Sequence, residues 1–342
     1  MTATATARRV PPMVDESVLS QIWKVSTAKN EIFDQSRARY GDAFGMNINR
    51  GKFYFLAHPD QVKEVFTASP EVLHAGKGNE ILATALGEHS VLLLDGSEHM
   101  RQRKLLLPSF HGEKLEAQTG AMERISEEVV ASIPRGESFH MRETSQKIAL
   151  EVILEIVLGT ASTGEQHDRL GKATRELLEW IGKGYRLALS SVFGPRSRPI
   201  KRMYKPALAP LDQGLYELIA ERRQATGLED RHDILSMLLL ARDEDGQPMT
   251  DLEIRDELVT LIVAGHETTA TALAWAFERL TRVPGGTERL HEEAVAGEGE
   301  YARWVSQEAL RLRPVLDFVL RRVMEPIEIG GYEFGEGDVL AP

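Results

Sequence analysis

Cysteine is absent from the chain of 342 residues. The chain therefore has no disulfide, zinc–thiolate centre, iron–sulfur cluster or cysteine nucleophile, and it offers no thiolate to an iron atom. Apolar runs are also short, since none reaches the ~20 residues that a membrane-spanning helix needs. The N-terminal residues Met1–Arg9 lack the apolar segment of a secretory signal. We expect a soluble, cytoplasmic protein with no membrane span.

Acidic residues outnumber basic ones, with 52 Asp and Glu against 41 Lys and Arg and a net charge of −11. The basic residues are scattered along the sequence, so we do not expect nucleic acid as a partner. Hydrophobic residues make up 42% of the chain, which is enough for a core and excludes wholesale disorder.

The periodicity of apolar residues predicts a mainly α protein with a minor sheet, an α+β arrangement. We expect a loose tail at 1–15 and a single domain over 16–342. Helices are predicted at 16–40, 61–67, 97–106, 112–132, 141–158, 164–190, 205–226, 231–241, 251–282, 286–296 and 301–313. Strands are predicted at 44–48 and 52–56, joined by a hairpin at 49–51, and at 315–323, 327–329, 332–334 and 337–340. Residues 74–94 are expected to form a long, partly helical loop, which is usually a functional feature.

The predicted helix at 251–282 contains an unusual centre. Thr250 and Glu253 form a capping-box pattern at its start, and its length corresponds to roughly 48 Å. The centre, Ala264–Thr269, carries a glycine, a carboxylate and two threonine hydroxyls between apolar flanks. A solvent-facing polar patch would explain it, but the apolar flanks favour a groove, opened by Gly265, in which a small ligand contacts the backbone. A zinc-protease H-E-x-x-H motif is excluded, because Ala270 stands where the second histidine belongs.

Three other spacings are weak signals when each is taken alone. Glu308 and Arg311 lie three residues apart on one helical face, as an ordinary surface pair does. His99 and Arg103 lie four apart and indicate only a basic helical face. Arg321 lies near the end of a predicted strand. These spacings do not by themselves define an anion site.

The order and content of these segments together resemble the cytochrome P-450 monooxygenases over nearly the whole chain. Ala264–Thr269 is similar to the family's oxygen-binding motif on its long central helix, and Glu308–Arg311 resembles its E-x-x-R motif. Gly96–Lys104 is similar to the G-x-x-H-x-x-x-R segment of its soluble bacterial members. Arg321–Gly331 resembles the strand that follows the E-x-x-R helix.

The resemblance implies the cytochrome P-450 fold, with haem b as cofactor, and a role for each matching residue. Glu267 and Thr268 would steer protons to bound dioxygen, and Gly265 would make room for it. The resemblance also implies that Ala264, Gly265 and Thr268 bind the haem cofactor. The residues implied in holding the two haem propionates are His99 and Arg103 for one and Arg321 for the other. The residues implied in a structural pairing inside the fold are Glu308 and Arg311.

The resemblance also implies partners. The substrate would be a small apolar organic molecule, and electrons would come from a ferredoxin and its reductase or a similar donor. Residues 74–94 and 176–205 would form much of the roof over the substrate. Within the second segment Tyr185, Leu187, Val192 and Phe193 suggest an apolar lining, although packing in the core would explain them equally well.

One element of the family pattern is missing, namely the glycine-rich loop with the cysteine that ligates the haem iron. We therefore expect that the chain is truncated before that loop, that it provides no metal ligand, and that it does not hydroxylate by itself. The alternative is a non-catalytic remnant that binds haem or a small molecule. An unrelated helical enzyme such as a terpene cyclase is disfavoured, since the aspartate-rich metal motif is absent.

Overall fold

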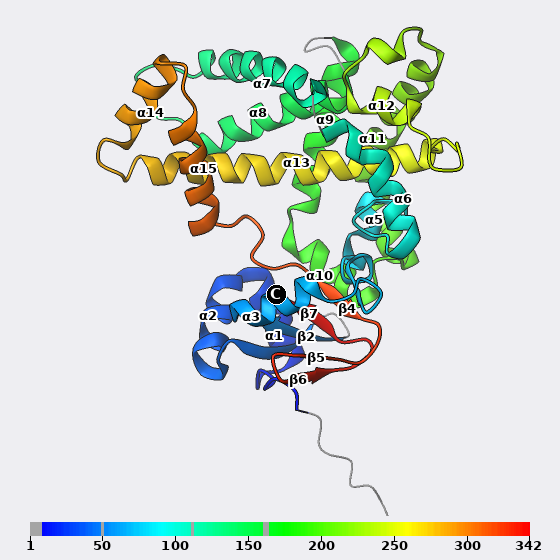
Figure 1. The fold of residues 1–342 in the computed structure, drawn as a ribbon, viewed down its shortest axis with the longest axis vertical. Helices are drawn as coiled ribbons and strands as arrows, with labels where there is room; N and C mark the ends of the chain where they lie inside the picture. The colour runs from blue at the N-terminus through cyan, green and yellow to red at the C-terminus, as the bar shows by residue number, and fades with distance from the viewer. Residues whose placement is uncertain (1–8, 49–50, 111–112, 160–163) are drawn as a thin grey trace, which may run out of the picture. The chain divides into compact units, whose positions relative to one another are not determined.

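The computed structural model describes residues 9–48, 51–110, 113–159 and 164–342 (Figure 1). Most of the predicted tail at 1–15 and the hairpin turn at 49–50 lie outside these ranges. The chain divides into two compact units. The first, here called the sheet unit, comprises 1–104, 176–210 and 318–342, and the second, the helical unit, comprises 105–175 and 211–317. None of the described helices is long and apolar enough to cross a membrane.

The sheet unit is built from strands near both ends of the chain, as predicted. Its five-stranded sheet has the order β1-β2-β7-β4-β3. β1 (Ala43–Ile48) pairs antiparallel with β2 (Gly51–Leu56), and β2 pairs in parallel with β7 (Val339–Ala341). β4 (Arg321–Val323) pairs antiparallel with both β7 and β3 (Leu73–His74). β5 (Ile327–Ile329) and β6 (Tyr332–Phe334) form a separate hairpin.

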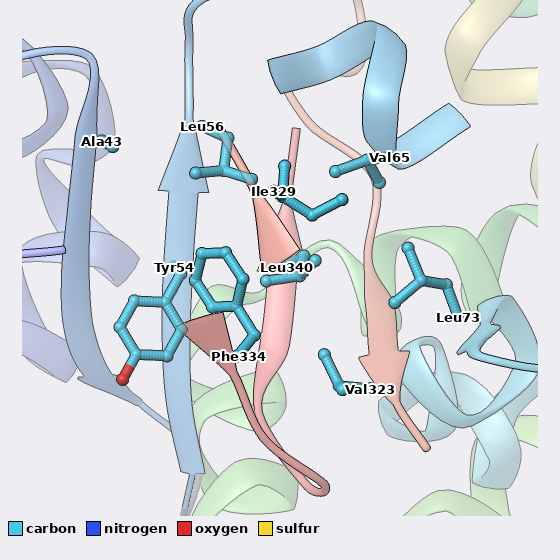
Figure 2. Packing of buried hydrophobic residues seen from close by; sticks show 9 residues of the cluster. All are labelled: Ala43, Tyr54, Leu56, Val65, Leu73, Val323, Ile329, Phe334 and Leu340. Carbon is cyan, nitrogen blue, oxygen red and sulfur yellow. The ribbon is translucent and has the colours of Figure 1, made fainter. Parts of the chain in front are cut away.

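One face of this sheet packs against the hairpin in an apolar cluster (Figure 2). Tyr54 of β2 meets Phe334 of β6 edge to face, with ring centroids 5.1 Å apart. Because side chains alternate along a strand, every second residue of β2 enters this cluster while its neighbours face the other side. Figure 2 shows the nine members: Ala43, Tyr54, Leu56, Val65, Leu73, Val323, Ile329, Phe334 and Leu340.

Short helices complete the sheet unit. α1 (Val18–Thr27), α2 (Lys29–Tyr40) and α3 (Pro59–Thr67) come first, and α3 begins at a proline, two residues before the predicted start of this helix. Residues 74–94 form the predicted partly helical loop, with α4 (Ala75–Gly78), the 3₁₀ turn η1 (Glu80–Leu82) and α5 (Ala83–Leu86). α6 (Gly96–Leu106) follows, and α10 (Gly184–Phe193) belongs to the same unit.

The helical unit is organised around α13 (Asp251–Leu280), a helix of 30 residues. α13 packs against α8 (Met141–Ile156) and α15 (Glu300–Leu312), while α7 (Glu113–Ala131) packs on α8. The remaining helices of this unit are α12 (Ile234–Leu240) and α14 (Gly286–Val295), with 3₁₀ turns at Leu107–Phe110 and Leu228–Asp230. Two helices are shared: α9 (Glu165–Ile181) and α11 (Arg198–Gln224) belong to the helical unit over 165–175 and 211–224 and to the sheet unit over 176–181 and 198–210.

Four of the predicted elements have wrong boundaries. The helix at 16–40 is two helices that meet at Ala28, which has a non-helical backbone and no local signal in the sequence. The helix at 164–190 is interrupted after Ile181, where Gly182 disfavours helix. The helix at 205–226 begins at Arg198 and keeps Pro206 and Pro210 on its exposed side, where water can bond the carbonyls that proline leaves free. Only the last three residues of 315–323 form a strand.

Candidate functional site

The centre of α13 is helical throughout, and the hydroxyl group of Thr268 is hydrogen-bonded within the helix. Thr250 accepts a hydrogen bond from the Glu253 amide at 3.2 Å, and Glu253 accepts one from the Thr250 amide at 2.7 Å, so the capping box is confirmed. Halfway along the helix Thr268 Oγ1 donates to the Ala264 carbonyl oxygen at 2.6 Å. Because that bond takes the hydroxyl proton, the lone pairs of Thr268 Oγ1 are left to accept a hydrogen bond.

The carboxylate of Glu267 is held by two side chains of α8. Arg142 Nη2 donates to Glu267 Oε1 at 2.5 Å, and Gln146 Nε2 donates to Oε2 at 3.0 Å. Partial burial by itself raises the pKa of Glu267, but the hydrogen bonds from Arg142 and Gln146 outweigh it, so the pKa lies below its ordinary value. Glu267 is therefore a carboxylate ion at neutral pH. Neither Arg142 nor Gln146 stands out in the sequence.

His266 lies next to this pair and is 5% exposed. Its Nε2 is 3.1 Å from the backbone carbonyl of Gln146, which can only accept, so Nε2 carries the proton. Burial lowers the pKa of His266, and the nearby Glu267 and the bond to Gln146 oppose the shift only in part. The ring is therefore neutral at pH 7 and anchors α13 to α8.

Gly265 lets these two helices approach each other. A Cβ at this position would lie 3.2 Å from Cδ1 of Ile153 on α8, closer than side chains normally pack. Helix packing thus gives a physical reason for this glycine. The groove and the space for oxygen at Gly265, and the binding of haem by Ala264, remain predictions.

The sheet unit brings three of the implied haem-binding cations into one electrostatic neighbourhood. Burial lowers the pKa of His99, Arg103 lowers it further, and Asp95 opposes the shift. Burial also lowers the pKa of the half-buried Arg321, again with Asp95 opposing. The Arg321 guanidinium lies 5.6 Å above the Phe66 ring and donates to the carbonyl of Leu320 at 2.9 Å. Arg321 therefore carries its positive charge at the cost of burial, and an added anion would relieve that cost.

Asp95 belongs to the same electrostatic neighbourhood and was not predicted from the sequence. Its two oxygens accept hydrogen bonds from the amides of Gly76 at 2.8 Å and Lys77 at 2.9 Å, at the start of α4. A Cβ on Gly76 would come within 2.4 Å of the Leu93 carbonyl oxygen, so only glycine fits there. The available signal was an aspartate directly before α6, which begins at Gly96, because aspartate favours such positions.

Glu308 and Arg311 bind each other on α15. Arg311 Nε and Nη2 donate to the two carboxylate oxygens of Glu308 at 2.7 and 2.6 Å. Both side chains are exposed, at 55% for Glu308 and 67% for Arg311. The two residues therefore form the predicted intrahelical pair, and the wider structural role implied for them remains a prediction.

The side chains predicted to bind haem suit its propionate groups, but none of them offers a sulfur ligand to the iron. His99, Arg103 and Arg321 are donors that bind carboxylates, and the half-buried Arg321 would gain most from one. The sequence contains no cysteine. Over the described ranges, no group of three or more His, Cys, Asp or Glu side chains could hold a metal ion.

Comparison with known proteins agrees with this set of features. A family model described as cytochrome P-450 matches residues 17–342, so the chain belongs to the cytochrome P-450 family. The family resemblance seen in the sequence is thereby confirmed, and membership implies haem as the cofactor.

Individual relatives are bacterial. Cytochrome P-450 135B1 of Mycobacterium bovis is 38% identical over 311 residues, in an alignment that covers 89% of this chain and 65% of the relative. Cytochrome P-450 137 of Mycobacterium tuberculosis is 36% identical, over 87% of this chain and 63% of its own length. The chain thus spans a little under two thirds of these relatives.

A solved structure supports the fold. The retinoic-acid-bound cyanobacterial CYP120A1 superposes with a TM-score of 0.82, covering 98% of this chain and 77% of that one, at 20% sequence identity. The mainly α fold with a small sheet that we predict is therefore confirmed.

Proposed function

We propose that this chain provides the oxygen-handling and haem-holding residues of a monooxygenase that hydroxylates a small apolar organic molecule. The observation that carries the proposal is the acid–alcohol pair halfway along α13, in which Glu267 is held as a carboxylate and Thr268 keeps its oxygen available to accept. Haem, when bound, supplies the iron at which dioxygen is activated.

In this proposal the two side chains divide the handling of protons. The Glu267 carboxylate accepts a proton from solvent and releases it towards the water held at Thr268, and hydrogen bonds from Arg142 and Gln146 stabilise the ionised form to which it returns. Thr268 Oγ1 positions a water molecule by accepting a hydrogen bond from it, because its own O–H group donates to the Ala264 carbonyl. Arg142 and Gln146 act through Glu267 and are positioning residues.

The cofactor's carboxylate arms would be held by the sheet unit. His99 and Arg103 bind one propionate and Arg321 the other, through charge-assisted hydrogen bonds. Support comes from Arg321, whose burial lowers its pKa and which an anion would stabilise as a cation.

The thiolate that the family's chemistry requires has to come from outside these 342 residues, since they contain no cysteine. We therefore propose that these residues alone do not hydroxylate. Electrons would reach the intact enzyme from a ferredoxin and its reductase or a similar donor. A non-catalytic haem-binding protein is the second candidate, favoured by the same missing sulfur.

The test is spectroscopic. The chain is loaded with haem, reduced and exposed to carbon monoxide, and we expect a Soret band without thiolate character. A thiolate-type band would contradict the proposed source of the ligand.

A second experiment separates the two candidates. The DNA beyond the codon for Pro342 is read, and any in-frame continuation with a glycine-rich loop and one cysteine is expressed with the chain. Incorporation of labelled dioxygen into an organic substrate supports the enzyme. A cysteine-containing protein that binds haem but incorporates no label supports the non-catalytic candidate.

A further inference from the structure

His266 is a buried titratable residue that the proposed mechanism does not use. Its ring is held at one nitrogen only, because Nε2 donates to the Gln146 carbonyl, whereas Nδ1 has no hydrogen-bond partner among the described residues and is shielded from solvent. A buried acceptor without a partner costs free energy, and native structures contain few such atoms. The unpaired Nδ1 therefore needs an explanation that anchoring to Gln146 does not provide.

The carboxylate of Glu267 faces this nitrogen. Glu267 Oε2 lies 3.7 Å from His266 Nδ1, too far for a hydrogen bond. With a neutral ring both atoms are acceptors and cannot bond each other, whereas a proton on Nδ1 makes it a donor. An approach of about 1 Å would then bring the two atoms to an ordinary N–H···O distance. The ring is buried and the Glu267 side chain is 41% exposed, so the carboxylate is the group with room to move.

The carboxylate can accept a third donor. Arg142 donates to Oε1, and Gln146 Nε2 donates to Oε2 at 3.0 Å. Each carboxylate oxygen accepts two hydrogen bonds, so Oε2 has the capacity to accept one from the His266 imidazolium as well. Hydrogen bonds to an ionised carboxylate favour its charged form. A bond from His266 would therefore make Glu267 harder to protonate than the two α8 side chains alone make it.

The charged groups of α8 leave a proton on His266 to Glu267. Arg142 is itself a cation and binds the same carboxylate. The other charged residues of this helix are exposed or bound to partners outside α13: Glu143, Lys147, Glu151 and Glu155.

The other elements packed on α13 are α12 and α15. α12 contains no charged residue. On α15 the charged residues pair with each other, Glu300 with Arg303 and Glu308 with Arg311. Along α13 itself, the next charged residues on either side are Glu257 and Arg279, over two helical turns from His266. Glu267 is therefore the anion that a proton on Nδ1 would bind.

The directions of the pKa shifts agree with such a contact. Burial lowers the pKa of His266, and Glu267 opposes that shift. Burial raises the pKa of Glu267, while Arg142, Gln146 and the charge on His266 lower it. The two residues thus titrate as a coupled pair. Because the ordinary pKa of histidine lies about two units above that of glutamate, the ring takes up the first proton.

We propose that His266 is a proton-operated latch that controls when Glu267 can take up a proton. At neutral pH the ring is uncharged, and the carboxylate exchanges protons with solvent. On acidification one proton passes from solvent to Nδ1, and the N–H group formed there binds Oε2 and holds the carboxylate as an ion. This inference rests on the proposed function, within which His266 is a positioning residue that acts on proton transfer through Glu267.

The first test uses the unaltered chain. It is labelled with carbon-13 at the glutamate carboxyl groups and with nitrogen-15 in the histidine rings, and it is followed by NMR as the pH is lowered. The carboxyl signal of Glu267, assigned by its loss in Glu267→Gln, should move in two steps, the first together with the protonation of His266. A single step that takes no part in the titration of His266 would overturn the proposal.

A substitution separates the latch from a structural anchor. The amide of His266→Gln can reach the position of Nε2 and donate to the Gln146 carbonyl, but it places no nitrogen where Nδ1 lies. We expect the first step to be lost and the pKa of Glu267 to rise, because the charge on His266 lowers it. An anchor alone predicts an unchanged titration of Glu267 in this variant, and that result would overturn the proposal. His291→Gln, at an exposed position, is the control and should keep both steps.

The reciprocal effect is measured on the histidine. Glu267→Gln should lower the pKa of His266, because the carboxylate that raises it is lost. Glu143→Gln removes the same charge from an exposed position of α8 and should leave the pKa of His266 unchanged. An equal decrease in both variants would show a general field of the acidic residues in place of a contact and would overturn the latch.

The consequence for proton transfer is tested in the cysteine-containing enzyme. His266→Gln should sustain hydroxylation to lower pH than the unaltered enzyme, because no imidazolium then holds the carboxylate. Identical pH profiles would overturn the positioning role. If neither form hydroxylates, the proposed function fails, while the NMR titrations still decide whether the latch exists. Circular dichroism establishes that the variants are folded at each pH, and the titration of the unaltered chain needs no variant.

Discussion

At the scale of single residues, the charged groups of the candidate site take their properties from neighbours distant in sequence. Glu267 is ionised because Arg142 and Gln146 donate to it, and Asp95 moderates the pKa of both His99 and Arg321. These relations make the pKa values of the site sensitive to single substitutions.

Asp95→Asn is predicted to lower the pKa of His99 further, because the carboxylate that favours the imidazolium is lost while burial and Arg103 remain. The measurement is an NMR titration of the histidine rings. Asp34→Asn, at an exposed position, is the control and should leave His99 unchanged. A pKa for His99 that rises in Asp95→Asn would contradict this electrostatic assignment.

Stability is predicted to fall as the pH drops from 7 to 5. The pKa values of His99 and His266 are lowered in the folded chain, so the unfolded chain binds more protons over this interval. The free energy of unfolding from urea denaturation should therefore decrease as the pH is lowered, and His266→Gln should make this dependence on pH weaker. His291→Gln, at an exposed position, should leave it unaltered. An equal slope in His266→Gln would show that burial of His266 is not a source of the effect.

At the scale of elements, the contact between α13 and α8 dominates the helical unit. It combines the close approach at Gly265 with the polar contacts of His266 and Glu267 to α8. The acid–alcohol centre of α13 is consequently supported from one side by a single helix.

This close approach can be tested with a double-mutant cycle. Gly265→Ala should gain less than the ~1 kcal/mol expected from helix propensity, because its Cβ meets Ile153 Cδ1. Ile153→Val removes that atom at a cost of about 0.5–1.5 kcal/mol, and in this background Gly265→Ala should give the larger gain. Urea denaturation gives the free energy of unfolding of the unaltered chain, the two single variants and the double variant.

Gly120→Ala on α7 is the matched control, since nothing lies within 4 Å of a Cβ added there. It should stabilise equally in both backgrounds. Additive effects for Gly265→Ala and Ile153→Val would mean that the two residues do not constrain each other.

At the scale of the whole molecule, the chain forms two compact units, whereas the sequence predicts a single domain over 16–342. Three segments build the sheet unit, so the backbone passes between the units several times. This connectivity favours the single domain, because neither unit is a continuous piece of chain.

We predict that both units unfold in one transition. Trp23 and Trp180 lie in the sheet unit, and Trp275 and Trp304 lie in the helical unit. Replacing both tryptophans of one unit with phenylalanine gives a double variant whose tryptophan fluorescence reports on the other unit alone. In each double variant, the urea midpoint measured by fluorescence should coincide with the midpoint measured by circular dichroism. Fluorescence that changes well before the dichroism in one variant would show independent domains.

Much of the secondary structure follows from local signals. The capping box at Thr250, the proline at the start of α3 and the alternation in β2 act through neighbours along the chain, and all three are seen in the structure. The family could likewise be read from short motifs in their order.

The tertiary structure decided what no local pattern encodes. Arg142 and Gln146 reach Glu267 across more than 120 positions, and Asp95 meets Gly76 across 19. On α10, the burial of Ser190 and the exposure of Tyr185 and Phe193 also follow from packing. Local sequence sets helix and strand because those bonds join near neighbours, whereas pairing of distant charges and exposure of a face are known only once the chain has packed.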